Sequence, residues 1–212
     1  MIDSIILDVD GTLWDSTPIV AKAWQGAARE CGFCDVIITP DTLKGLFGKT
    51  MEKIAEAILP NESKEAQASF MKACTEAEQE ALDNDPCRIE YPGVIETIKE
   101  LSKEVPVTIV SNCQSGYIEL FIEKSGLGAY ITDKECYGDT GFGKAHNEKL
   151  VIDRNHFKFP VYVGDTEGDR EASEEAGVRF IYASYGFGSP KSFYKRIDKF
   201  NDIITIVKEE NS

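Results

Sequence analysis

Short runs of β-branched and other apolar residues recur along the chain, and amphipathic helical patterns separate them. Continuous apolar runs of this length are typical of strands that are buried on both faces of a sheet. The alternation of strands and helices predicts the α/β class, with a three-layer, doubly wound parallel sheet. The expected strands cover residues 4–7, 105–110, 130–137, 159–163 and 178–183.

Two of the intervening segments have clear helical periodicity. Val94, Ile98 and Leu101 fall on one face of a helix. The pattern in residues 116–126 ends at Gly126, which we expect to be the C-cap of a second helix.

The segment between the first two expected strands is unusually long and contains only helical patterns. These patterns lie at 17–32, 51–59 and 63–84. We therefore expect a helical cap of residues 15–87, inserted into a core formed by residues 1–14 and 88–212.

The composition restricts the partners and the compartment. The chain has 23 Lys and Arg against 37 Asp and Glu, a formal charge of −14, which argues against non-specific binding to nucleic acid or to an anionic membrane. The early apolar run, Ile5 to Leu7, is too short for a secretory signal, and no run approaches the roughly 18 apolar residues of a membrane span. With six scattered cysteines, we expect a cytoplasmic protein with reduced thiols.

Acidic residues follow two of the expected strands. Asp8 and Asp10 come after the first strand, and Asp165 follows the fourth, with Asp169 one helical turn further on. Ligands of open parallel sheets bind outside the carboxyl ends of the strands, so these four carboxylates should converge there. Such a cluster needs a cation or protons, and hard oxygen ligands without nearby His or Cys favour Mg²⁺.

Two further positions suit the binding of a phosphate group. Ser111, followed by Asn112, stands at a strand end, where its hydroxyl could donate to a phosphate oxygen. Lys144 follows two glycines at the start of a helical pattern, 21 positions before Asp165.

Taken in order, the stretches "DVDGT", "VSN", the glycine-flanked Lys144 and "GDTEGD" resemble the four motifs of the haloacid dehalogenase superfamily of phosphatases. The resemblance implies a Rossmann-like core with strand order 3-2-1-4-5, and the helical insertion matches the cap of that family. The stretch "YGFG" at 185–188 looks like the phosphoglycolate phosphatase branch. Many members of that branch have a proline after the motif lysine, whereas Ala145 stands here, so Lys149 remains an alternative to Lys144.

The resemblance also implies roles for these residues. Asp8 would attack phosphorus and carry an aspartyl-phosphate, and Asp10 would protonate the leaving group and then activate water. Asp8, Asp165, Asp169 and the backbone carbonyl of Asp10 would form the Mg²⁺ site. Ser111, Asn112 and Lys144 would bind the phosphate of a small phosphorylated metabolite.

Other functions share parts of this pattern. A phosphosugar mutase similar to β-phosphoglucomutase has the same motifs and is the main alternative. A non-enzymatic signalling domain phosphorylated on aspartate is also acidic and binds Mg²⁺, but it carries its acceptor on a later strand and has no cap.

Substrate selection is expected to depend on the cap. Gly48, Lys49 and Thr50 form an expected turn between two helical stretches, and such a turn can approach the core closely. Lys49 could then offer a cation to a carboxylate or a second phosphate. Trp14 could line the same cavity, or could pack between core and cap.

Overall fold

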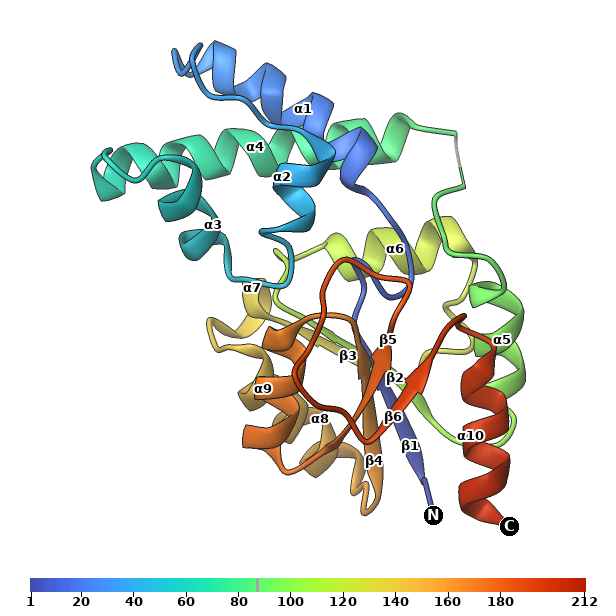
Figure 1. Cartoon of the computed structure of the whole chain (residues 1–212). Coiled ribbons are helices and arrows are strands. Elements are labelled where there is room, and N and C mark those ends of the chain that lie inside the picture. Colours follow the sequence, from blue (N-terminus) through green and yellow to red (C-terminus); the bar gives the residue numbers. More distant parts are fainter. Residues whose placement is uncertain (87) are drawn as a thin grey trace.

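The structure is a computed structural model, and it describes residues 1–86 and 88–212. Its centre is a parallel six-stranded sheet with the order β3-β2-β1-β4-β5-β6 (Figure 1). The strands are β1 (Ser4–Leu7), β2 (Val107–Ser111), β3 (Asp133–Cys136), β4 (Pro160–Gly164), β5 (Arg179–Ala183) and β6 (Lys195–Ile197). The predicted α/β class and the order of the first five strands are confirmed, while the short edge strand β6 was not expected.

Helices cover both faces of the sheet, as continuous apolar strands require. In β1, Ile5 and Leu7 face one apolar cluster and Ile6 faces another. The first cluster includes residues of α5 (Val94–Leu101), α6 (Tyr117–Ser125) and α10 (Asp202–Asn211). The second includes residues of α8 (Lys144–Asn155) and α9 (Glu167–Ala176), which lie on the opposite face (Figure 1).

The two predicted core helices form as expected. Val94, Ile98 and Leu101 of α5 are all buried against the sheet. Helix α6 ends at Gly126, whose φ of 68° is the left-handed conformation that suits glycine at a helix end.

Four helices follow β1 and lie beyond the carboxyl ends of the strands (Figure 1). They are α1 (Thr17–Glu30), α2 (Pro40–Lys44), α3 (Met51–Ile58) and α4 (Lys64–Asn84). The two chain segments that join them to the core run side by side, since Asp15 N donates to Ile89 O at 3.0 Å and Tyr91 N to Leu13 O at 2.9 Å. The expected end of the cap at residue 87 lies outside the described residues.

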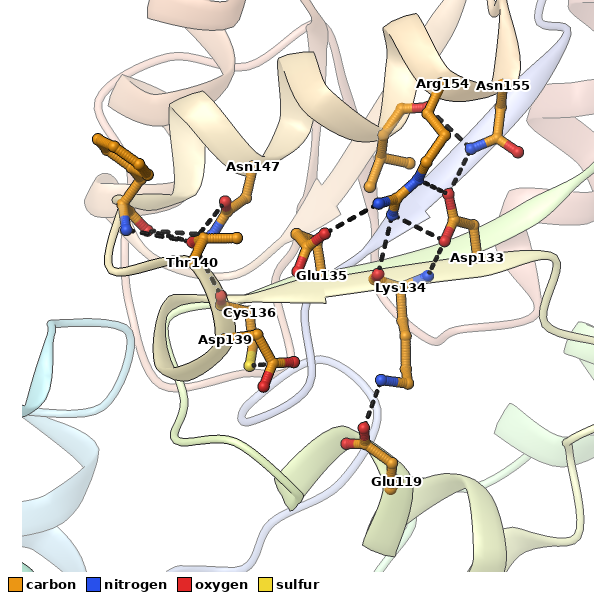
Figure 2. Close-up of polar contacts among 12 residues, drawn as sticks. Glu119, Asp133, Lys134, Glu135, Cys136, Asp139, Thr140, Asn147, Arg154 and Asn155 are labelled. Atoms are coloured by element: carbon orange, nitrogen blue, oxygen red, sulfur yellow. Dashed lines mark hydrogen bonds and ion pairs between the residues drawn. The ribbon is translucent and has the colours of Figure 1, made fainter.

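Polar contacts hold α8 against the edge strand β3 (Figure 2). Arg154 donates to Asp133 through two nitrogens, each at 2.8 Å, and to Glu135 at 3.1 Å. Paired contacts of a planar guanidinium fix orientation as well as distance. Helix α8 is thereby oriented on the sheet, with Lys144 at its first turn.

No helix within residues 1–86 and 88–212 is long and apolar enough to cross a membrane.

Candidate active site

Three carboxylates meet at the carboxyl ends of β1 and β4. These strands are neighbours in the sheet, so Asp8 after β1 and Asp165 after β4 are brought together. Asp169 joins them from the first turn of α9. Among the described residues, one carboxylate oxygen from each of the three lies within 4.8 Å of the other two, and all three residues are buried.

The first turn of α9 holds Asp169 in a capping box. Thr166 Oγ1 accepts from Asp169 N at 3.2 Å, while Asp169 Oδ2 accepts from Thr166 N at 2.8 Å. The same oxygen accepts from Asp165 N at 3.1 Å. Helix-capping bonds of this kind fix the carboxylate at i+4 from Asp165 in one orientation.

Glycines let the backbone approach Asp165 closely. A Cβ at Gly186 would lie 2.3 Å from Asp165 Cβ, and one at Gly11 would lie 2.4 Å from its carboxylate. Asp165 itself accepts from Phe187 N at 2.6 Å and from Thr12 Oγ1 at 3.3 Å. The glycines of "DVDGT" and "YGFG" therefore have a steric reason to be there.

Lys144 is the cation of this cluster, and Lys149 is not part of it. Lys144 Nζ lies 2.9 Å from Asp8 Oδ1 and also pairs with Asp169, and all three side chains are buried. Lys149 is exposed on α8. The structure thus places Lys144, and not Lys149, beside the acidic residues.

The loop before Lys144 is closed by its own polar contacts. Thr140 Oγ1 bonds to Asn147 Oδ1 at 2.9 Å, and Asn147 Nδ2 donates to Phe142 O at 3.0 Å (Figure 2). Gly143 is the N-cap of α8, so Lys144 and Ala145 are its first two residues. The N–H groups of a first helical turn have no partner within the helix, so a proline there loses no hydrogen bond. Proline and alanine are therefore both compatible with position 145.

Burial and like charges raise the pKa of the clustered acids. Burial raises the pKa of Asp8 to about 6, although Lys144 opposes the shift. Burial, together with Asp169 and Asp8, raises the pKa of Asp165 well above its usual value. The neighbouring carboxylates raise the pKa of Lys144 despite its burial. One lysine does not neutralise three carboxylates, so the cluster favours a further positive charge.

The cluster fits a divalent metal of the hard class. Its donors are carboxylate oxygens, which Mg²⁺ prefers, and no His or Cys belongs to the group within the described chain.

Asp10 has a different environment from Asp8. Its Oδ1 accepts from Ser16 Oγ at 2.7 Å, from Tyr117 OH at 2.8 Å and from Trp14 Nε1 at 3.0 Å. Burial raises the pKa of Asp10 to about 7, although Ser16 and Tyr117 oppose the shift. Its carboxylate is not one of the three clustered groups, and its pKa suits a group that both gives and takes a proton near neutral pH.

Ser111, Asn112 and the cap turn lie together at the end of β2. Ser111 and Asn112 line a cavity that also contains Asp8 and Asp10. Asn112 Nδ2 donates to Gly48 O at 2.9 Å, so the turn does approach the core. Lys49 lines the same cavity but is exposed, with its ammonium 3.2 Å from Gly45 O, whereas Thr50 lines only the open groove outside it.

Trp14 packs against the core helix α6 and does not line this cavity. Its ring meets Tyr117 and Phe121 edge-on, at centroid distances of 5.4 and 5.2 Å. Its indole N–H orients Asp10 as described above.

Sequence reasoning missed several residues of the site. Ser16 and Tyr117 hold Asp10, while Glu78 of α4 and Gln114 line the cavity. Glu148, one turn after Lys144, is buried, and neither of its carboxyl oxygens has a hydrogen-bond partner among residues 1–86 and 88–212. The spacing of Glu148 from Lys144 was the available signal for that residue; the others come together only in three dimensions.

Comparison with known proteins shows which family the chain belongs to. The model of the haloacid dehalogenase-like hydrolase family matches residues 5–183. The chain belongs to this family, and its predicted nature as a hydrolase of the family is confirmed.

Relatives support the expected branch. A phosphoglycolate phosphatase of Rhodobacter capsulatus is 24% identical over 95% of this chain and 94% of its own. Pyrophosphatase PpaX of Oceanobacillus iheyensis is 23% identical over 97% of each chain. A haloacid dehalogenase-like hydrolase of Bacteroides fragilis has the same fold, with a TM-score of 0.84 at 20% identity, over 96% of this chain and 100% of that one.

Proposed function

We propose that the protein is a Mg²⁺-dependent phosphatase that hydrolyses a small phosphate monoester through an aspartyl-phosphate on Asp8. The observation that carries the proposal is the buried group of Asp8, Asp165 and Asp169, in which Lys144 pairs with Asp8 and Asp169. Asp10 is held nearby, and its pKa is about 7. The phosphatase names of relatives that align over nearly the whole chain support it.

Asp8 would be the nucleophile. Its carboxylate oxygen forms a bond to phosphorus while the bond from phosphorus to the ester oxygen breaks, and Asp10 gives its proton to the leaving alkoxide. In the second step Asp10 removes a proton from water, the water oxygen bonds to phosphorus, and Asp8 leaves with its electron pair restored. Inorganic phosphate and the alcohol are the products.

The other residues would position and neutralise the phosphoryl group. The ammonium of Lys144 offsets charge on Asp8 and on the transferring oxygens, and the hydroxyl of Ser111 donates to one of them. Mg²⁺, held by Asp8, Asp165, Asp169 and the carbonyl of Asp10, would supply the positive charge that lets a carboxylate approach a phosphate dianion. Helices of residues 15–87 would act as the cap and exclude water during transfer.

Metal dependence and the two aspartates can be tested together. Purified protein should hydrolyse p-nitrophenyl phosphate with Mg²⁺ and lose that activity in excess chelator. Asp8→Asn should abolish phosphoenzyme, whereas Asp10→Asn should still trap it but turn over about 10² to 10⁴ more slowly.

Two results would count against the proposal. Undiminished turnover in chelator would refute the metal assignment, and label retained on an aspartate in Asp8→Asn would refute the nucleophile. Transfer of phosphate to a second sugar position, with little net release, would identify the protein as a mutase instead.

A further inference from the structure

One carboxylic acid of the active-site cavity takes no part in this mechanism. Glu78 comes from the middle of α4, is 3% exposed, and lines the cavity that contains Asp8 and Asp10. A buried acid facing a reaction site is costly, so its partners and its surroundings bear on the ligand that fits there.

Two donors from different parts of the fold hold Glu78. Trp24 Nε1 of α1 donates to its Oε2 at 2.8 Å, and Gln114 Nε2, just after β2, donates to its Oε1 at 3.0 Å. One partner is on a cap helix and the other on the core. The carboxyl is thereby fixed between cap and core, and each of its oxygens keeps a lone pair for a further donor.

The walls around Glu78 are apolar, and the cavity is small. Trp24, Phe47, Met51 and Ile54 line it together with Glu78. Its volume is about 30 Å³, which leaves room for one or two water-sized groups. Because the same cavity contains Asp8, Ser111 and Asn112, which would bind the phosphate, little room remains for the alcohol part of a substrate, and we expect it to be short.

The charge of the cavity disfavours an anionic alcohol part. Asp8, Asp10 and Glu78 are its acids, and Lys49 is the one cation among its described lining residues. Lys49 is exposed, bonds to Gly45 O and also lines the outer groove, so it lies at the rim. A carboxylate placed near ionised Glu78 would face like charge.

We propose that Glu78 selects phosphate esters of short hydroxylated alcohols, by accepting a hydrogen bond from a hydroxyl of the leaving group, and that the ionised form of Glu78 disfavours carboxylate-bearing esters such as phosphoglycolate. This inference rests on the proposed phosphatase function. Burial raises the pKa of Glu78 to about 8. A hydroxyl both donates and accepts, so it pairs with either protonation state. A carboxylate pairs well only with the protonated acid, and an ammonium pairs well only with the ionised one.

The test uses esters of matched size with Mg²⁺ present: 2-hydroxyethyl phosphate, phosphoglycolate, 2-aminoethyl phosphate and propyl phosphate. At pH 9, where Glu78 is ionised, the wild-type protein should have a kcat/KM about tenfold or more higher for the hydroxyethyl ester than for phosphoglycolate, because like-charged buried groups are strongly penalised. At pH 7, where Glu78 holds its proton, the hydroxyethyl ester should also be preferred over the 2-aminoethyl ester. In Glu78→Gln, the ratio of kcat/KM for 2-hydroxyethyl phosphate to kcat/KM for phosphoglycolate should fall towards one. Glu80→Gln, an exposed change on the same helix, should keep the wild-type ratio.

The outcomes separate the two proposals. A wild-type preference for phosphoglycolate at pH 9, for 2-aminoethyl phosphate at pH 7, or for propyl phosphate at either pH overturns the selectivity inference and leaves the phosphatase proposal intact. An unchanged ratio in folded Glu78→Gln also overturns it. Absence of hydrolysis of every ester, including p-nitrophenyl phosphate, refutes the proposed function itself. The wild-type comparison is decisive even if Glu78→Gln does not fold.

Discussion

Asp8 and Asp10 have different environments although only one residue separates them in the sequence. Asp8 pairs with Lys144 inside the acidic group, while Asp10 accepts three hydrogen bonds from neutral donors. A charge partner favours the ionised form, and burial among neutral groups favours the protonated form. This difference fits a division of labour between a nucleophile and a proton donor.

Lys144 is the residue whose loss should be most informative. Lys144→Ala removes the cation between Asp8 and Asp169, so we expect kcat to fall by about 10² to 10³, as for loss of an electrostatic contact in other active sites. Lys149→Ala, an exposed change on the same helix, should be nearly silent. Steady-state kinetics with Mg²⁺ measure both, after circular dichroism has shown that each variant is folded. A larger loss in Lys149→Ala would reverse the assignment.

At the scale of elements, the turn between α2 and α3 joins the cap to the core. Gly48 O accepts from Asn112, and Gly48 has a φ of 88°, which a residue with a side chain adopts only under strain. A Cβ there would also lie 3.3 Å from Thr166 Oγ1, beside the capping box of α9. The turn is therefore fixed both by its own backbone and by the core surface beneath it.

Gly48→Ala should loosen this turn. The left-handed backbone costs a residue with a Cβ about 1 to 2 kcal/mol, and 1.4 kcal/mol corresponds to a factor of ten, so KM should rise by up to about thirtyfold. Gly45→Ala is the matched control, because Gly45 has an ordinary helical φ of −78° and the nearest atom to a Cβ lies 3.5 Å away. Equal KM values for the two variants would show that the turn does not contribute to substrate binding.

At the scale of the whole molecule, core and cap share one apolar interior. The larger cluster runs from β1 and β2 through Trp14 to Trp24 and Phe70 of the cap helices. Burial of continuous apolar surface is the main favourable contribution to folding, so the docked cap contributes to the stability of the whole. Glu78 is buried between the cap helices and the core, so its protonation affects the stability of the whole protein.

Stability should therefore depend on pH through Glu78. Its pKa is about 8 in the folded protein against 4.5 ordinarily, so the folded state holds a proton that the unfolded state has lost. Between those values the free energy of unfolding should fall as pH rises, by up to about 1.4 kcal/mol per pH unit from this group. Glu78→Gln should flatten the dependence, and Glu80→Gln should not. The free energy of unfolding can be measured by urea denaturation from pH 5 to 8. The same dependence of this free energy on pH in wild type and Glu78→Gln would contradict the linkage.

The sequence by itself determined the strands and the acidic residues at their ends, while the strand order was implied by the resemblance of its motifs to a known family. Local periodicity and short spacings carry this information, because β-branched runs and i+4 pairs act within one element. It also placed Lys144 at a helix start, although Ala145 left Lys149 open until the structure showed which lysine is buried.

Only the tertiary structure decided what surrounds the reacting groups. The contacts of Asp10 with Tyr117 and of Glu78 with Gln114 join residues 107 and 36 positions apart. The three-residue strand β6 is defined by pairing with β5 more than by its own sequence. No local pattern encodes such contacts, since they depend on how the cap helices dock on the sheet. That docking places Glu78 in the cavity that contains Asp8.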